Sequence, residues 1–186
     1  MASIITATTT SGLTQSADNS GVLQLASGTG NLVTVPSVTG TAMVSGNMPT
    51  FYAYNSAGNQ SVTSATFTKI NLATEIWDTN SNFASSRFTP TVAGYYQFNG
   101  SFSVEGLGTV TRFIISIYKN GAEYIRGIDS VTTGNSAIIS TMISMNGTTD
   151  YVELYGLIVG AGGIGFRGDA CASLYTYFQG CLLRAS

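Results

Sequence analysis

Histidine is missing from this chain of 186 residues. Its absence excludes the Ser-His-Asp and Cys-His arrangements of nucleophilic catalysis and removes the usual imidazole acid–base group. It also removes the commonest protein ligand of zinc. The carboxylates are scattered along the sequence, and no tight acidic loop of the kind that binds calcium is present. We therefore expect a protein without catalytic residues, a metal site or a cofactor.

Charge of either sign is also scarce. Charged residues make up 9% of the sequence, and the formal net charge is -2. A protein that holds the phosphate backbone of a nucleic acid needs a basic field, and this sequence supplies none. We therefore do not expect nucleic acid as a partner.

Long apolar runs are lacking as well. No stretch reaches the roughly 20 apolar residues that span a bilayer, and residues 1–6 contain neither a basic region nor an apolar run. We expect a soluble protein without a visible export signal and without membrane insertion. Cys171 and Cys181 are the only cysteines. We interpret them as small apolar fillers, with a disulfide as the alternative.

Aromatic residues are absent before Phe51, and Asp18 is the single charged residue of the stretch 1–48. Two short alternating runs, 22–25 and 31–35, predict strands in this stretch. With so few large apolar groups it cannot offset an ordering cost of about 1 to 2 kcal/mol per residue. We predict an N-terminal arm, residues 1–48, that becomes ordered against a larger partner or further copies. A flexible tail is the alternative.

From residue 49 to residue 186 the sequence predicts one all-β domain. A long half-buried strand is expected within 88–104, where Tyr96, Phe98 and Phe102 alternate with polar residues. Asn120-Gly121 is typical of a tight hairpin, because both positions tolerate positive φ. About eight to ten short strands separated by turns, with no credible helix, indicate a β-sandwich or jelly roll.

Four segments of this domain resemble, in the same order, the C1q/TNF-like globular head. They are the signature Phe88-x5-Gly94-x-Tyr96-x-Phe98, the hairpin 119–121, the strand 150–154 and the closing strand 178–183. The polar loop before Phe88 is longer than usual for that family, and no Gly-X-Y collagen stalk is present. The arm 1–48 takes the place of the stalk.

The resemblance implies a jelly-roll head that forms a homotrimer through one sheet. If the aromatic residues of the signature fill the core, period two places Tyr95 and Gln97 on the opposite face of their strand. On the closing strand the same reasoning places Tyr177 and Leu183 outward. We predict that these four residues lie in the trimer interface. The alternative is that edge or loop segments cover them.

One loop cluster is a candidate for binding a sugar. Trp77, Asn80 and Asn82 combine an aromatic face with amide groups, which suit the faces and hydroxyls of a saccharide. The alternative is that Trp77 packs in the core or at the end of the sandwich.

A second cluster lies in the glycine-rich stretch 156–170, which we expect to be a surface loop before the last strand. Its Gly160-to-Gly165 run lacks the strand–turn–helix context of a dinucleotide-binding loop. Ile164, Phe166 and Arg167 in this stretch are candidates for contact with a partner.

The stretch 12–25 resembles N-terminal segments of bacteriophage virion fibre and decoration proteins. With the head, this predicts a non-enzymatic virion structural protein assembled in the host cytoplasm. Residues 1–48 would anchor it to a capsid or tail protein, and the trimeric head would face outward. The alternative is a receptor-binding tail fibre tip that recognises a glycan or protein of the host surface.

A glycan-cleaving enzyme is the third class considered. Such an enzyme requires two suitably spaced carboxylates. The two close pairs, Glu75 with Asp78 and Asp150 with Glu153, are interpreted instead as solvated charges at strand ends. We therefore expect no enzymatic activity.

Overall fold

The computed structural model describes residues 23–26, 32–35, 46, 48–105, 109–131, 135–168 and 174–186. The chain divides into two compact units, Met1–Thr41 and Ala42–Ser186. The first unit contains two strands, β1 (Leu23–Ala26) and β2 (Leu32–Val35), where the two alternating runs predict strands, and the two pair antiparallel with each other. Most of the predicted arm lies outside the described residues, so its anchoring role stays a prediction.

The described part of the second unit consists of strands and their connections, without an α-helix. The strands are β3 (Thr50–Tyr54), β4 (Gln60–Ser61), β5 (Thr68–Lys69), β6 (Thr74–Asp78), β7 (Phe83–Ala84), β8 (Arg87–Phe88), β9 (Gly94–Glu105), β10 (Thr109–Lys119), β11 (Ala122–Ser130), β12 (Ser136–Met145), β13 (Val152–Ala161), β14 (Gly165–Phe166) and β15 (Tyr177–Ala185).

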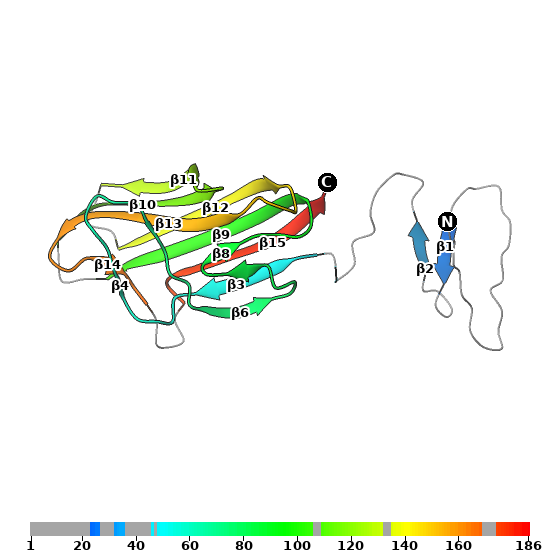
Figure 1. The fold of residues 1–186 in the computed structure, drawn as a ribbon, viewed down its shortest axis with the longest axis horizontal. Coiled ribbons are helices and arrows are strands. Elements are labelled where there is room, and N and C mark those ends of the chain that lie inside the picture. The colour runs from blue at the N-terminus through cyan, green and yellow to red at the C-terminus, as the bar shows by residue number, and fades with distance from the viewer. Residues whose placement is uncertain are drawn as a thin grey trace. The chain divides into compact units, whose positions relative to one another are not determined.

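These strands form two antiparallel sheets that pack as a sandwich (Figure 1). The β13 sheet has the order β11-β10-β13-β8-β7, and β5 also pairs with β13. The β9 sheet has the order β4-β14-β9-β15-β3-β6, and β12 also pairs with β9. The long β9 and β10 strands therefore lie in different sheets.

The eight strands of the sandwich that pair in a nested order are β3, β8, β9, β10, β11, β12, β13 and β15. The first and last of them, β3 and β15, lie side by side, and β8 pairs with β13. Inside these pairs β9 runs beside β12, and β10 forms a hairpin with β11. This nested antiparallel order in two sheets is a jelly roll. It confirms the predicted fold class, an all-β jelly-roll sandwich.

Aromatic rings join the two sheets. Phe51 of β3 stacks on Phe88 of β8 with ring centroids 4.4 Å apart. Phe98 of β9 meets Phe88 edge-on at 5.9 Å and stacks on Phe178 of β15 at 5.6 Å. All four rings are fully buried. The signature residues that carried the family resemblance are therefore the centre of the core.

Gly94 lies at the start of β9, where the end of β15 passes very close. A Cβ at this position would clash with the Arg184 carbonyl oxygen and lie 2.7 Å from Leu182 Cδ1. Only glycine permits this approach of the two backbones. The signature glycine thus holds the closing strand against the central one.

The glycine-rich stretch differs from the expected surface loop. β13 continues to Ala161, and Gly156 lies inside the strand. A Cβ at Gly156 would lie 2.5 Å from Cε1 of Phe166, whose ring packs at 4.9 Å from that of Phe102. Ile164 and Phe166 are both buried in the core. Here glycine makes room for an aromatic ring, a role that composition alone does not reveal.

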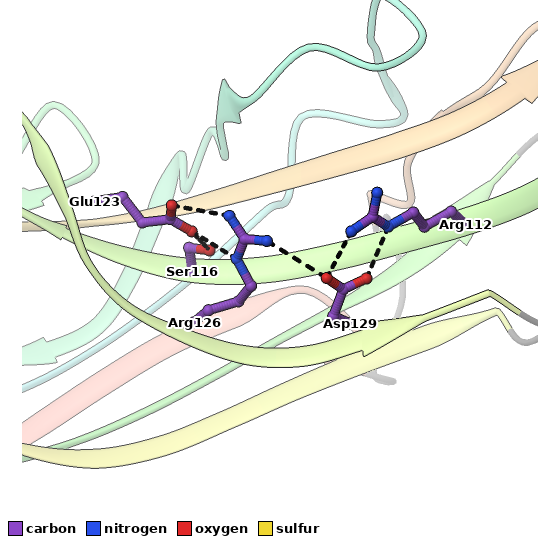
Figure 2. A network of polar contacts seen from close by, with 5 residues as sticks. All are labelled: Arg112, Ser116, Glu123, Arg126 and Asp129. Atoms are coloured by element: carbon purple, nitrogen blue, oxygen red, sulfur yellow. Dashed lines mark hydrogen bonds and ion pairs between the residues drawn. The ribbon is translucent and has the colours of Figure 1, made fainter.

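An ion-pair network covers part of the outer face of the β13 sheet (Figure 2). Arg112 donates to both carboxylate oxygens of Asp129, at 2.8 and 2.7 Å. Arg126 donates to both oxygens of Glu123 at 2.9 Å and lies 3.4 Å from Asp129 Oδ2. The Ser116 hydroxyl donates to Glu123 at 2.7 Å. The network therefore ties β10 to β11.

These contacts favour the ionised carboxylates. Hydrogen bonds from Arg126 lower the pKa of Glu123, and hydrogen bonds from Arg112 lower the pKa of Asp129. A carboxylate whose pKa is lowered by folding stabilises the fold above its unfolded-state pKa, and this contribution is lost as the pH falls through the folded-state pKa. Because the side chains are partly exposed, solvent screening keeps the contribution small.

We expect Asp129→Asn to lower the melting temperature slightly at neutral pH. The difference from wild type should disappear in acid, as the pH falls below about 4 and through the lowered folded-state pKa of Asp129, where the wild-type carboxyl is protonated as well. Thermal unfolding followed by circular dichroism across this range measures the effect. Glu75→Gln, at an exposed position of β6, is the control. A difference that stays constant at every pH would contradict an electrostatic origin.

Candidate functional site: an outward sheet face and a polar pocket

Four strands of the β9 sheet, β3, β9, β12 and β15, carry almost no charge. Their charged residues are Glu105 and Arg184, each near the end of its strand. The face of an antiparallel sheet that contacts water usually carries polar and charged residues, whereas the outward face of the β9 sheet exposes large apolar side chains. The composition of the face suits contact with protein.

The four predicted interface residues all lie on this face. Tyr95 and Leu183 are exposed, and Gln97 and Tyr177 are half-buried. Their neighbours Phe178 and Leu182 point into the core, as the period of two requires. The structure thus brings the four residues onto one surface, and their role in an interface stays a prediction.

The sequence analysis missed two residues of the same surface. Ile138 and Met142 of β12 are 59% and 65% exposed, and they lie opposite Ser101 and Gln97 of β9. The alternation in β12 carried the signal, because one phase of the strand is buried at Ala137, Ile139, Ile143 and Met145, and the other phase must face outward. The apolar surface therefore extends to the β12 edge.

Aromatic residues form the other flank of the face. Tyr52 of β3 stacks on Trp77 of β6 with centroids 5.2 Å apart, and its ring lies 5.5 Å from that of Tyr177. Burial and the neighbouring Tyr177 raise the pKa of Tyr52. Trp77 is 45% exposed, and its Nε1 donates to Thr50 Oγ1 at 3.3 Å. Trp77 is therefore a surface residue of an edge strand and not a core residue.

The centre of the face is polar but internally bonded. Gln97 Nε2 donates to Ser140 Oγ at 3.0 Å, and Ser140 Oγ donates to Asn99 Oδ1 at 2.8 Å. Polar groups that already have partners lose less when water is removed from them. Removing water from this face on association therefore carries a smaller desolvation penalty than its number of polar groups suggests.

A polar pocket of about 520 Å³ lies at the β7–β8 hairpin, at the edge of the other sheet. It is lined by Lys69, Ser81, Asn82, Ala84, Ser85, Arg87, Thr89 and Thr91. Ala84 is the one apolar residue among them. The lining of the pocket therefore consists almost entirely of residues with polar or charged groups.

A buried carboxylate holds the two cations of the pocket. Glu153 of β13 is 3% exposed, and its Oε1 accepts hydrogen bonds from Lys69 Nζ at 3.2 Å and Arg87 Nε at 2.9 Å. The Arg87 guanidinium also lies 3.8 Å from the centre of the Tyr151 ring. The interpretation of Glu153 as a solvated strand-end charge was wrong, because two partners from β5 and β8 compensate its burial.

The hairpin itself turns at two serines in the left-handed region. Ser85 and Ser86 have φ of 52° and 58°, which makes a two-residue turn of the type that usually contains Asn and Gly. Ser86 Oγ accepts a hydrogen bond from the buried Leu72 N–H at 2.8 Å. Lys69 Nζ donates to the Ser85 carbonyl at 3.1 Å. These bonds fix the rim of the pocket to the neighbouring segment.

The predicted sugar-binding cluster is divided between the two surfaces. Trp77 stacks on the outward face of the β9 sheet, whereas Asn82 lines the pocket and is itself buried. The amide of Asn82 donates to the Asn80 carbonyl at 3.1 Å, and that of Asn80 donates to the Gly46 carbonyl at 3.0 Å. The two amides thus hold the loop in place.

The second predicted cluster is also separated. Ile164 and Phe166 are core residues and are not available to a partner, which corrects their expected exposure. Arg167 is partly exposed and lies 4.2 Å over the Tyr175 ring and 3.7 Å from Glu105. Of the three residues, Arg167 alone lies at the surface.

Two further features concern only the residues that the structure describes. Among them, no three His, Cys, Asp or Glu side chains come together in a group that could hold a metal ion. No helix in this part of the chain has the length and apolar character to cross a membrane. Cys181 has a free thiol, and Cys171 lies outside the described residues.

The sequence matches no protein-family model and no curated protein. Similar solved structures include crystal structures of murine APRIL at pH 8.5, 8.0 and 5.0, which are 10%, 9% and 11% identical to this chain. The matches cover 73%, 72% and 73% of this chain and 99%, 97% and 99% of the others, with TM-scores of 0.48, 0.49 and 0.49. We infer neither function nor partner from a likeness of this degree.

We expect Ser86→Ala to destabilise the protein by about 1–3 kcal/mol, because it leaves the buried Leu72 N–H without an acceptor. Ser85→Ala is the matched control. It makes the same change in the same backbone region, but at an exposed hydroxyl, and should cost less than about 0.5 kcal/mol. Urea unfolding gives both free energies. Equal effects of the two substitutions would contradict the assigned hydrogen bond.

Proposed function

We propose that this protein is a non-enzymatic structural protein of a bacteriophage virion whose jelly-roll head forms a homotrimer through the outward face of the β9 sheet. The observation that carries the proposal is the exposed and nearly uncharged surface of β3, β9, β12 and β15. When another copy covers large apolar side chains on a sheet face, their surface is removed from water and the free energy of the complex falls. Other copies of the chain are the natural cover for a surface of this kind.

The two flanks of the face favour a ring of copies over a two-fold dimer. Ile138 and Met142 form an aliphatic flank on β12, whereas Tyr52 and Trp77 form an aromatic flank on β3 and β6. A two-fold dimer sets the same patch against itself, whereas a contact between two different flanks is head-to-tail and forms a ring when its rotation closes. The resemblance of the sequence to C1q/TNF-like heads favours a ring of three copies.

The virion role rests on the N-terminal stretch. Residues 12–25 resemble segments of phage fibre and decoration proteins, and the low aromatic and charge content of residues 1–48 suits an arm that orders on a larger assembly. We propose that this arm attaches the trimer to a capsid or tail protein. The protein then acts by assembly and adhesion, without turnover.

A receptor-binding fibre tip is the second candidate. The observation that favours it is the polar pocket at the β7–β8 hairpin, which belongs to the β13 sheet. Association through the β9 sheet leaves this pocket open to a molecule of the host surface. The two candidates share the trimer and differ in the partner of the head.

We expect the wild-type chain to be a trimer and Met142→Lys to be a monomer at low micromolar concentration. The side chain is largely exposed in the single chain, so the substitution spares the fold, but every interface of the ring would bury an unpaired ammonium group at a cost of several kcal/mol. Light scattering coupled to size-exclusion chromatography gives the mass.

Thr63→Lys is the control for this experiment. Thr63 is exposed beside the β13 sheet, where Ala65 N donates to the Ile158 carbonyl, so it adds the same charge away from the proposed interface. This variant should remain trimeric. A monomeric wild type, or a trimeric Met142→Lys, would remove the β9 sheet face from the proposal.

We expect the full-length chain to bind phage particles from which it has been stripped. A synthetic peptide of residues 1–41 in excess should compete with this binding, and a scrambled peptide of the same composition should not. Co-sedimentation with the particles measures both. Binding that the peptide does not reduce would place the anchor in the head, and absence of binding to any particle would contradict the virion role.

A further inference from the structure

We infer that the pocket at the β7–β8 hairpin binds an anionic saccharide, a sugar ring that carries a carboxylate or sulfate group. The inference rests on two cations that share one buried carboxylate at the side of a cavity rich in hydroxyl groups. It goes beyond the proposed assembly role and does not depend on it, because the pocket and the proposed trimer interface belong to different sheets.

The charges of the pocket do not cancel. Lys69 and Arg87 both line the cavity, whereas their common partner Glu153 is buried behind them and is not among the lining residues. Two positive charges against one negative charge leave a surplus of one positive charge facing the cavity. Asp78 does not line the pocket, and its Oδ2 accepts a hydrogen bond from Phe83 N–H at 2.7 Å. The pocket therefore favours a ligand with a single negative group.

Arg87 is positioned before a ligand arrives. Its Nε donates to Glu153 Oε1 at 2.9 Å, and its Cζ lies over the Tyr151 ring, 3.8 Å from the ring centre. A guanidinium has five N–H groups, so the contact with Glu153 leaves donors for a second anion. A side chain that is already ordered loses little conformational entropy on binding. The entropic cost of ordering Arg87 when an anion binds is therefore low.

The remaining lining groups match the hydroxyls of a sugar. The side-chain hydroxyls of Ser81, Ser85 and Thr89 form no hydrogen bond with any other residue that the structure describes, so they are available as donors and acceptors. The cavity of about 520 Å³ is large enough for a small saccharide. An inorganic anion would use the cations and leave these hydroxyls unused.

The direct test is a calorimetric titration of the full-length protein with four probes at low salt. The probes are 3′-sialyllactose, which carries one carboxylate, lactose 3′-sulfate, which carries one sulfate, and the controls lactose and sodium sulfate. We expect at least one of the two acidic saccharides to bind at least about tenfold more tightly than lactose and sulfate, and to weaken when salt rises from about 50 to about 200 mM. Comparison of the two acidic probes distinguishes carboxylate from sulfate as the preferred group.

A charge placed in the pocket provides the second measurement. Ser85→Asp adds a carboxylate at an exposed lining position and should weaken binding of the acidic saccharide at least about tenfold by like-charge repulsion. Ala57→Asp makes an equal change of charge at an exposed residue after β3, outside the pocket, and should bind as wild type does. Circular dichroism confirms that both variants are folded.

Three results would overturn the inference. They are the failure of both acidic saccharides to bind, equal affinity for sodium sulfate and the saccharides, and unchanged binding by Ser85→Asp. The same samples, examined by light scattering, report the oligomeric state independently. A trimer that does not bind sugar refutes the pocket alone, and a monomer that binds sugar refutes the proposed assembly alone.

Discussion

The stack of aromatic rings between the two sheets is the contact on which the rest of the structure depends. Phe51 and Phe98 of the β9 sheet meet Phe88 of the β13 sheet at ring distances of 4.4 and 5.9 Å. Because side chains alternate along a strand, placing these rings inside determines which residues of each strand face outward. A slip of one residue in β9 would bury Gln97 and expose Phe98. The outward surfaces are therefore consequences of the core.

The two sheets present surfaces of opposite character. The outward face of the β9 sheet is apolar at its flanks and internally hydrogen-bonded at its centre. The β13 sheet carries the Arg112–Asp129 and Arg126–Glu123 ion pairs and, at its edge, the cations of the polar pocket. This division suits a molecule that uses one sheet for contact with its own copies and leaves the other to solvent and ligands. Assembly and ligand binding can then coexist on one small domain.

Local sequence patterns predicted the strands well where apolar and polar side chains alternated. They failed at residues whose role depends on contacts with distant parts of the chain. The alternation in 94–104 and the Asn120-Gly121 turn were both confirmed. Gly156 suggested a loop, but it lies in β13 because the Phe166 ring needs its space. Burial of Glu153 was equally invisible, since its partners Lys69 and Arg87 come from two distant strands.

The sequence by itself determined the all-β class, the strands of the head and the inward or outward direction of their side chains, because these follow from period two and from turn residues. Only the tertiary structure decided which outward residues become neighbours. Strand order places β12 beside β9, so that Met142 joins Gln97 on one face. It also gathers Lys69, Arg87 and Glu153 at one hairpin. Such neighbours depend on pairing between strands far apart in the chain, which local residue patterns do not encode.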